Sequence, residues 1–342
     1  MKTIIEKATP ESIARAAVII KRGGLVAFPT ETVYGLGANG LDNAAALGIY
    51  AAKGRPADNP LILHIADKET VYELAAEVSS AAQTLTDAFW PGALTLILPK
   101  KPHIPDAVSG GLDTVGVRMP SNPIARELIR AAGLPLAAPS ANSSGRPSPT
   151  LAGHVADDLD GKIDMILDGG ACDKGVESTV VEVTNAGACV LRPGAVTVEQ
   201  LREVIPDVWI DGAVEKSPDE DFAPKSPGMK YRHYSPEAEV ILVTGGERQV
   251  TEYIILNAEN QKNTGILAAS QTLAEYEGKG YTVLSLGDRE NPADAAASLY
   301  RCLREFDTLG ISRVYAEGVN ERGLGLAVMN RLKKAASETV RL

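Results

Sequence analysis

The apolar positions near the N-terminus change period from one segment to the next, and each period predicts an element. Residues 25–28 form an apolar run that a proline ends, which predicts a buried strand. Asp42 precedes a helix-periodic stretch and Gly54 follows its last residue, which predicts a short helix between them. Residues 61–65 alternate with the period of a second strand. The polar, glycine-rich residues 29–41 are expected to form a loop between the first strand and the helix.

A further alternating stretch, residues 114–119, separates polar from apolar side chains. Thr114, Gly116 and Arg118 fall on one face of the predicted strand, whereas the valines and the methionine between them fall on the other. The valine and methionine face belongs to the core. The first face offers a hydroxyl group, a gap at Gly116 through which a ligand could approach the backbone, and a cation, so we expect it to border a binding cavity.

The C-terminal part of the chain alternates strand-like with helix-like segments, which predicts a mostly parallel sheet with helices on its faces. The strands are expected at residues 240–243, 265–268, 281–286 and 313–316, and the helices near 249–259, 292–309 and 326–337. Residues 211–236 precede this pattern and hold four prolines and many charges, so they are interpreted as a linker. We therefore predict a first domain over residues 1–210 and a second over 237–342.

Composition and charge favour a globular protein of two domains and ordinary enzyme size. The chain has 342 residues, of which 44% are hydrophobic and 23% charged. Its formal net charge of -10 argues against a nonspecific nucleic-acid binder, although a local basic pocket is compatible with it. The three cysteines are far apart, with neither zinc-site spacing nor a disulfide framework, which fits a reducing compartment. No apolar run approaches the length that spans a membrane, so we expect a cytoplasmic protein.

Residues 35–40, Gly-Leu-Gly-Ala-Asn-Gly, match the G-x-G-x-x-G spacing of a dinucleotide-binding turn. The context does not fit, because six residues, 29–34, separate the predicted strand from the first glycine, and Asp58 lies in a loop instead of at a strand's end. We therefore expect these glycines to serve tight turns. No phosphate-binding G-x-x-x-x-G-K-[ST] sequence occurs in the chain.

The stronger candidate for chemistry is a set of cations and hydroxyl groups from separate segments. Lys53 and Arg55 are two residues apart in an extended segment, where they could span adjacent phosphates. Ser140 and Asn142 open a hydroxyl-rich loop that ends at a predicted helix N-terminus and so could bind an anion. Taken singly, each residue type also has an ordinary structural explanation: a solvated arginine, a turn hydrogen bond or, at His64, a half-buried histidine.

Lys53 and Arg55 form a K-x-R sequence, and Ser140 and Asn142 form an S-x-N sequence. Around them lie the segments PTETVYGLGANG, KGRPADNPLILHI, FWPGALTLIL, VGVRMP, APSANSSGRPSPT, GVESTVV, LRPGA, SPGMKYRHYSP and GLAVMNRLKKAA. Together these motifs resemble the long, two-domain form of threonylcarbamoyl-AMP synthase. The resemblance implies a YrdC-like α/β domain with a twisted mixed sheet and helices, followed by a smaller Rossmann-like α/β domain.

The resemblance also implies an enzyme, a nucleotidyltransferase that converts L-threonine, bicarbonate or carbon dioxide, and ATP into L-threonylcarbamoyl-adenylate and pyrophosphate. A partner transferase would then pass the threonylcarbamoyl group to adenosine 37 of tRNA, so the reaction would be the first step of that modification. Mg²⁺ is expected on the nucleotide phosphates, not in a metal site built by protein residues alone. Such chemistry needs no nucleophilic triad, because the protein has to hold three reactants, exclude water and neutralise phosphate charge.

By resemblance, the site residues fall into three groups. Those expected to act in catalysis are Lys53 and Arg55. Arg118 would face the carboxylate of L-threonine, and the residues expected to hold this substrate are Thr32, His64, Arg118, Ala138 and Ser178. Those expected to hold ATP are Arg55, Asn59, Thr114, Ser140, Asn142, Ser148, Arg192 and Tyr234.

Residues 229–234 of the predicted linker alternate aromatic with basic side chains. They could form a lid that closes on the nucleotide, with Tyr234 as an ATP ligand, or a tether that only packs its aromatic rings. Two other functions remain open at this point. One is a tRNA or double-stranded-RNA binding module without synthase activity. The other is a carbamoyl-transferring relative that acts on hydrogenase maturation factors, against which the absence of zinc-finger and acylphosphatase-like segments counts.

Overall fold

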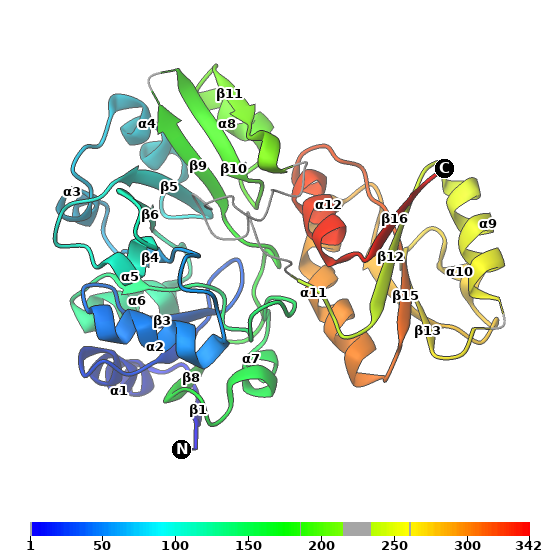
Figure 1. Ribbon diagram of the computed structural model, residues 1–342, viewed down its shortest axis with the longest axis horizontal. Coiled ribbons are helices and arrows are strands. Elements are labelled where there is room, and N and C mark those ends of the chain that lie inside the picture. The colour runs from blue at the N-terminus through cyan, green and yellow to red at the C-terminus, as the bar shows by residue number, and fades with distance from the viewer. Residues whose placement is uncertain (1, 185, 215–233, 260) are drawn as a thin grey trace. The chain divides into compact units, whose positions relative to one another are not determined.

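The computed structural model describes residues 2–184, 186–214, 234–259 and 261–342, and it divides into two compact units (Figure 1). The first unit comprises Met1–Ser144 and Ser148–Tyr231, and the second comprises Gly145–Pro147 and Arg232–Leu342. Most of the predicted linker, residues 215–233, lies outside the described residues.

The first unit is built on one sheet of eleven strands in the order β1-β8-β2-β3-β7-β4-β6-β5-β9-β10-β11. Parallel and antiparallel neighbours both occur, so the predicted mixed sheet is confirmed. The strands are β1 (Ile4–Lys7), β2 (Val26–Phe28), β3 (Gly35–Asn39), β4 (Ile62–His64), β5 (Leu94–Pro99), β6 (Thr114–Arg118), β7 (Leu136–Ala137), β8 (Met165–Asp168), β9 (Thr179–Thr184), β10 (Gly187–Arg192) and β11 (Val208–Ile210). The helices are α1 (Pro10–Lys21), α2 (Asn43–Lys53), α3 (Val71–Leu74), α4 (Ser80–Phe89), α5 (Asp106–Ser109), α6 (Pro123–Ala132), α7 (Ala152–Leu159) and α8 (Val198–Val204), with short 3-10 helices η1 (Lys68–Thr70) and η2 (Gly212–Val214).

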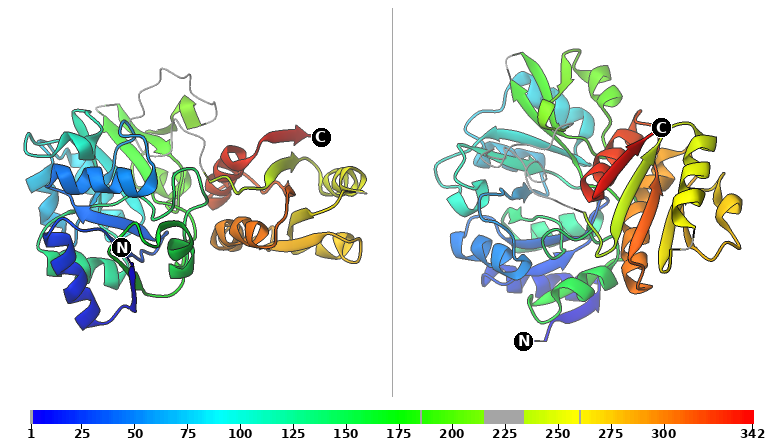
Figure 2. Two further views of the ribbon diagram at one scale, coloured as in Figure 1. Left: turned by 60° about the horizontal axis from the view of Figure 1, so that its bottom comes forward. Right: turned by 45° about the vertical axis from the view of Figure 1, so that its right-hand side comes forward.

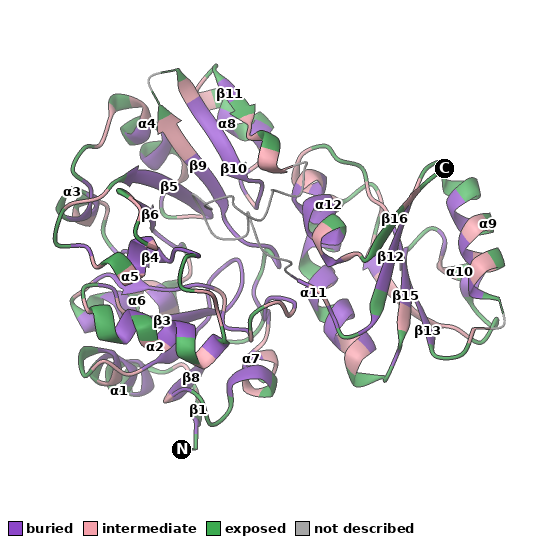
Figure 3. Ribbon diagram, viewed as in Figure 1, coloured by how far each residue is buried: buried purple, intermediate pink, exposed green. Residues whose placement is uncertain are grey.

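The apolar stripes of α1 and α6 bury themselves against the same part of this sheet. Ile13 and Ile20 of α1 join Leu128 of α6, Phe28 of β2 and Met165 of β8 in one buried cluster. Helical spacing places the two isoleucines on a single face of α1, which explains why this helix can cover a sheet. Figure 3 shows the result as a nearly continuous run of buried residues along the central strands.

Residues 35–39 depart from the prediction, because they form the strand β3 and not a loop. β3 pairs antiparallel with both β2 and β7. Gly35 and Gly37 lie inside this strand, so the interpretation as turn glycines is wrong for these two, whereas Gly40 does lie in the turn that follows β3. None of the three has a positive φ angle. The requirement is for space: a Cβ atom at Gly37 would stand 2.7 Å from the ring of Phe28, and one at Gly40 would stand 2.7 Å from the carbonyl oxygen of Pro135.

Other boundaries also differ from the prediction. Helical structure in residues 68–77 is limited to the short helices η1 and α3. The strands β1, β8 and β11 were not predicted. β1 is an edge strand whose Ile4 and Ile5 are about half exposed, so no buried apolar run marks it. By contrast, the N-cap at Asp42 is confirmed, because its Oδ1 accepts hydrogen bonds from two backbone amides, and Gly54 ends α2 with a φ of 64°.

The second unit contains a sheet of five strands whose pairs are all parallel, in the order β14-β13-β15-β12-β16. The strands are β12 (Glu239–Thr244), β13 (Thr264–Ala269), β14 (Thr282–Gly287), β15 (Arg313–Glu317) and β16 (Glu338–Arg341). Figures 1 and 2 show α11 (Pro292–Thr308) and α12 (Leu324–Ala335) on one face of this sheet, with α9 (Glu247–Ala258) and α10 (Leu273–Tyr276) on the other. The predicted parallel sheet is confirmed. The helix expected to reach residue 337 ends at Ala335, and the unpredicted β16 follows it.

The second unit is discontinuous, because Gly145–Pro147 group with it although their neighbours on both sides belong to the first unit. Nη2 of Arg304 donates a hydrogen bond to the carbonyl oxygen of Pro147 at 2.5 Å. Arg146 forms an ion pair with Asp307 at 3.2 Å. These contacts attach the short segment to α11.

In the part of the chain that the structure describes, no helix has both the length and the apolar composition needed to cross a membrane.

Candidate active site

The sheet of the first unit brings several predicted threonine ligands to one set of strand ends. β4 and β6 run parallel and end side by side at His64 and Arg118. β5 runs antiparallel to β6 and places Thr95 opposite Arg118. β9 runs parallel to β5, so Ser178, just before β9, reaches Thr95, and the two hydroxyl oxygens lie 2.8 Å apart. His64, Arg118 and Ser178 therefore belong to one cluster.

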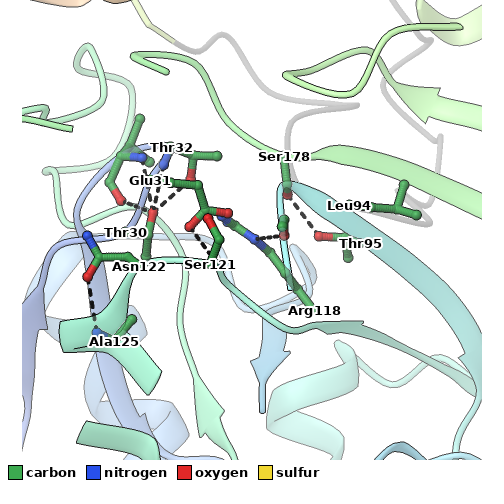
Figure 4. Close-up of polar contacts among 12 residues, drawn as sticks. Thr30, Glu31, Thr32, Leu94, Thr95, Arg118, Ser121, Asn122, Ala125 and Ser178 are labelled. Atoms are coloured by element: carbon green, nitrogen blue, oxygen red, sulfur yellow. Dashed lines mark hydrogen bonds and ion pairs between the residues drawn. The ribbon is translucent and has the colours of Figure 1, made fainter. Parts of the chain in front are cut away.

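Arg118 is paired with a carboxylate that the sequence analysis did not single out. Nη2 of Arg118 donates to Oε1 of Glu31 at 2.6 Å, and Nε donates to the carbonyl oxygen of Gly92 at 3.3 Å (Figure 4). The backbone amide of Ser121 donates to Oε2 of Glu31 at 3.2 Å. The side chains of Arg118 and Glu31 are only 5% and 7% exposed. Because an isolated charge is costly to bury, the pairing of these two groups offsets part of the cost of burying each of them.

His64 is buried and uncharged. Its residue is 4% exposed, so the expectation of a half-buried histidine is wrong. Burial, with a smaller contribution from the charge of Arg118, lowers the pKa of His64 to about 3. Nδ1 lies 3.1 Å from the carbonyl oxygen of Ile62, and the ring meets that of Phe28 edge-on. A neutral imidazole can exchange hydrogen bonds with a hydroxyl group, but it cannot neutralise an anion.

Thr32 lies beside Glu31 in the loop between β2 and β3 (Figure 4). The hydroxyl of Thr30 donates to the carbonyl oxygen of Val33 at 2.6 Å. The hydroxyl of Thr32, which is 2.8 Å from that of Thr30, is therefore the donor in this second pair. The lone pairs of the Thr32 oxygen can still accept a hydrogen bond from a ligand.

Arg192, predicted as an ATP ligand, lies against Ser178 of the first cluster. Its Nη2 donates to the carbonyl oxygen of Ser178 at 3.0 Å and to the hydroxyl oxygen at 3.2 Å. Gly194 follows in a turn that has no room for a side chain, because a Cβ atom there would stand 2.4 Å from the carbonyl oxygen of Glu177 and from the amide of Thr179. This close approach gives a physical reason for glycine in the LRPGA segment.

A second cluster joins the K-x-R and S-x-N sequences. Lys53 ends α2 and is 4% exposed. Its Nζ donates to the carbonyl oxygen of Ser140 at 2.5 Å and to that of Asn142. The hydroxyl of Ser140 donates to Oδ1 of Asn142 at 2.5 Å. The ammonium group that the resemblance places over phosphates is thus also a support for the backbone of this loop.

The segment between α2 and β4 contains a buried side-chain amide, that of Asn59, for which the described residues offer no hydrogen-bond partner. Arg55 holds the segment together, because its Nε donates to the carbonyl oxygen of Asn59 at 3.2 Å and its Nη2 to that of Pro60 at 3.0 Å. The residue Asn59 is 1% exposed, and neither Nδ2 nor Oδ1 has a hydrogen-bond partner among the described residues. Because burying an unpaired amide costs free energy, the side chain of Asn59 has the character of a ligand-binding group.

Thr114, Ala138 and Ser148 occupy different surroundings. Thr114 begins β6, at the opposite end of the strand from Arg118, which is about 13 Å away along five residues of extended chain. Ala138, predicted to hold threonine, lies level with the middle of β6, because its amide donates to the carbonyl oxygen of Ile62 at 2.9 Å and Ile62 pairs with Gly116. Ser148 is fully buried, and its hydroxyl donates to Oε1 of Glu177 at 2.5 Å.

The gap expected at Gly116 does not exist. A Cβ atom at this position would stand 3.3 Å from the side chain of Ile62 and 3.4 Å from those of Thr95 and Ile97. The side chains of Ile62, Thr95 and Ile97 on neighbouring strands fill the space above Gly116. Any ligand that lies between Thr114 and Arg118 would therefore contact these side chains and not the Gly116 backbone.

Of the predicted site residues, Tyr234 belongs to the second unit. Its ring stacks on that of Tyr300 with centroids 5.5 Å apart, and the guanidinium carbon of Arg331 lies 5.2 Å from its centroid. Its φ angle is 68°, in the left-handed region. The other residues proposed for a lid, 229–233, lie outside the described residues.

Two buried carboxylates escaped the sequence analysis, Glu31 and Glu177. Glu31 lies in the segment PTET and Glu177 in GVEST, and the other residues of both segments are mostly hydroxyl-bearing or apolar. A single acidic residue in such surroundings could have indicated a buried, paired carboxylate. Within the described ranges, no group of three or more His, Cys, Asp or Glu residues could hold a metal ion. The carboxylates of the two clusters are bonded instead to Arg118 and Ser148.

Comparisons with known proteins cover both units. A family model described as "Telomere recombination" matches residues 18–194, and one described as "Threonylcarbamoyl-AMP synthase, C-terminal domain" matches residues 196–337. A threonylcarbamoyl-AMP synthase of Pyrococcus abyssi is 50% identical, over 94% of this chain and 93% of that protein. One of Bacillus subtilis is 46% identical, over 96% of this chain and 94% of that protein.

The fold is likewise similar to a solved one. A crystal structure of P. abyssi Sua5 complexed with L-threonine matches with a TM-score of 0.91 and 47% identity, covering 100% of this chain and 99% of that one. The resemblance suggested by the sequence motifs is thereby confirmed along both units.

Proposed function

This chain belongs to the threonylcarbamoyl-AMP synthase family, and from that premise we propose how its first unit joins L-threonine, bicarbonate or carbon dioxide, and ATP into threonylcarbamoyl-AMP and pyrophosphate. The enzyme is of the nucleotidyltransferase type, and its reaction is the first step of the threonylcarbamoyl modification of tRNA. The observation that carries the assignment of roles is the separation of two polar clusters by the length of β6. Arg118 and Glu31 mark one end, and Thr114 marks the other.

Threonine binds at the Arg118 end in this proposal. The guanidinium group of Arg118 receives the substrate carboxylate, because it is a buried cation at the strand end beside His64. Thr32, His64 and Ser178 offer hydroxyl and imidazole groups that suit the substrate hydroxyl. Ala138 lies level with Gly116, midway between the two ends of β6, and contributes backbone groups or contact surface at the junction of the two substrates.

ATP binds at the other end, where Lys53 and Arg55 act as the catalytic cations. Support comes from the unpaired amide of Asn59, which a nucleotide can satisfy, and from the hydroxyl groups at Thr114, Ser140 and Ser148. Asn142 shares the loop that Lys53 supports. Arg192, next to Ser178, would lie where the nucleotide approaches the threonine, and the resemblance adds Tyr234 as a proposed ATP ligand.

The proposed chemistry takes place between the substrates. The ammonium group of threonine gives up a proton to water, and its nitrogen then attacks the carbon of carbon dioxide and forms the nitrogen–carbon bond. Loss of a second proton from that nitrogen to water leaves the carbamate. An oxygen of the carbamate then attacks the α-phosphorus of ATP, and the bond from that phosphorus to pyrophosphate breaks. No protein atom joins or leaves a covalent bond, so the protein contributes orientation, positive charge and exclusion of water.

Magnesium fits this site only as part of the nucleotide, because the described residues offer no cluster of three metal-binding side chains. It would neutralise phosphate charge together with Lys53 and Arg55.

We further propose that the labile product passes to a downstream tRNA threonylcarbamoyltransferase, and that the enzyme works in the cytoplasm. Direct contact with tRNA belongs to the same proposal.

The test is pyrophosphate release from ATP, measured with and without L-threonine and with and without bicarbonate. We expect release only when all three substrates are present. Arg118→Ala should raise the KM for threonine far more than that for ATP, whereas Arg130→Ala, which removes an exposed arginine paired with Asp67 at 2.6 Å, should change neither. Release without threonine would contradict the proposal. Tight tRNA retention in low salt without ATP, with no pyrophosphate release, would favour an RNA-binding module instead.

A further inference from the structure

The pairing of Arg118 with Glu31 raises a question about the charge that the threonine end presents. Within the described ranges, each carboxylate oxygen of Glu31 accepts one hydrogen bond, Oε1 from Arg118 and Oε2 from Ser121. A carboxylate has about four lone-pair positions, so Glu31 can accept further hydrogen bonds. The backbone of Glu31 is itself fixed, because its carbonyl oxygen accepts from the amide of Lys174 at 2.8 Å.

An arginine that had only to bind a carboxylate would be weakened by this neighbour. Glu31 cancels much of the positive charge of Arg118 and repels a second carboxylate that approaches the same guanidinium group. The pair is neutral as a whole. A neutral pair of opposite charges is instead complementary to a ligand that also carries both charges, provided that each ligand charge meets the opposite one.

A free amino acid is such a ligand, because its ammonium and carboxylate groups are attached to the same carbon atom. The two side-chain charges are similarly close, with 2.6 Å between Nη2 of Arg118 and Oε1 of Glu31. We propose that Glu31 is a substrate-binding residue that accepts hydrogen bonds from the α-ammonium group of L-threonine while Arg118 holds the α-carboxylate. This inference rests on the proposed function, because it places threonine at Arg118.

The position of Glu31 in the fold supports this role. Thr32, the next residue along the chain, belongs to the same loop and presents the hydroxyl oxygen described above, so one short segment can contact two functional groups of the substrate (Figure 4). The hydroxyl pair of Thr30 and Thr32 fixes the turn that carries them. Glu31 would then give the site a preference for amino acids over hydroxy acids of the same shape.

The experiment compares two ligands that differ only in the amino group, L-threonine and 3-hydroxybutyrate. Their dissociation constants are measured for the full-length protein, directly for threonine and by competition for the weaker ligand. Glu31→Gln keeps the size of the side chain and removes its charge. We expect threonine to bind at least about tenfold more weakly, as for loss of a charge-assisted hydrogen bond, and 3-hydroxybutyrate to bind equally well or better.

Three further variants complete the test. Arg118→Gln should weaken both ligands, and Glu31→Asp, which keeps the charge, should recover part of the threonine affinity and serves as the alternative if Glu31→Gln does not fold. Glu317→Gln is the matched control, because Glu317 is a buried carboxylate of the second unit paired with Arg289 at 2.8 Å, and it should change neither affinity.

Equal weakening of both ligands by Glu31→Gln would overturn the inference, since Glu31 would then act only by positioning Arg118. Unchanged threonine affinity in Glu31→Gln would overturn it as well. Unchanged threonine affinity in Arg118→Gln would instead show that the proposed threonine site is wrong, and the inference would fall with it.

Discussion

Replacing Lys53 with methionine tests whether its ammonium group supports the loop of Ser140 and Asn142 or acts on the nucleotide alone. The substitution keeps the length of the side chain but removes the donor for two backbone carbonyl oxygens in a buried position. Leaving a buried acceptor unsatisfied costs about 1–3 kcal/mol, so two of them lower the free energy of unfolding of the first unit by about 2–6 kcal/mol. Loss of activity alone would not reveal this effect.

Urea unfolding followed by tryptophan fluorescence measures the free energy of unfolding of the first unit. Both tryptophans of the chain, Trp90 and Trp209, belong to the first unit, so their signal reports the unfolding of that unit and avoids a two-state treatment of the whole chain. With a dependence on urea of about 2–3 kcal/mol per molar, the midpoint of Lys53→Met should fall by about 1 M or more.

Lys101→Met is the matched control, because Nζ of Lys101 also donates to a carbonyl oxygen, that of Tyr72, but in an exposed position. We expect its free energy of unfolding to stay within about 0.5 kcal/mol of that of the unsubstituted protein. If Lys53→Met is inactive yet unfolds at the same urea concentration as the unsubstituted protein, the loop does not depend on Lys53, and a structural role for its ammonium group is refuted.

Three other predictions concern the same unit. Asn59→Ala should raise the KM for ATP about tenfold or more while changing the free energy of unfolding by less than about 1 kcal/mol, because the amide has no protein partner among the described residues; lost stability with an unchanged KM would contradict its role. Gly194→Ala should destabilise the first unit by about 2 kcal/mol or more in a urea titration, whereas Gly212→Ala, where nothing lies within 4 Å of the added carbon, should not; equal midpoints would refute the steric explanation. Because the pKa of His64, about 3, lies below its usual value of 6.5, the stability due to the neutral ring is present above pH 6.5 and is lost as the pH falls toward 3. At pH 5 this loss of stability is about 2 kcal/mol. If a His64→Gln variant loses as much stability between pH 7 and pH 5 as the unsubstituted protein does, His64 is not the source of the pH dependence.

Hydrophobic periodicity and cap residues were sufficient to predict those helices and strands that their own residues determine. α2 begins and ends where Asp42 and Gly54 predict, and the alternation of the C-terminal part predicted a parallel sheet with helices on both faces. The strand β3 was not predicted, because its glycines were interpreted only from the conformational freedom that glycine has. The requirement for glycine comes from the ring of Phe28, a residue of another strand, and single-segment patterns do not contain that information.

The candidate site shows the same division. Resemblance to a family supplied Arg118 and Ser178, and the register of four strands explains why they meet. Glu31 was overlooked because its importance depends on a pairing with a residue far along the chain, and no local spacing predicts such a pair. Lys53 was identified as a cation for phosphates, whereas its support of the loop carbonyls required coordinates.

The attachment of Gly145–Pro147 to the second unit matters for anyone who recombines members of this family. The backbone passes from one unit to the other after Ser144, returns before Ser148, and enters the second unit again between Val214 and Tyr234. A hybrid gene joined at a single point in the 215–233 region would give the Pro147 carbonyl an Arg304 from a different parent. Exchanging the tripeptide together with the C-terminal unit would keep each native set of contacts, and that pair of junctions is the one the architecture recommends.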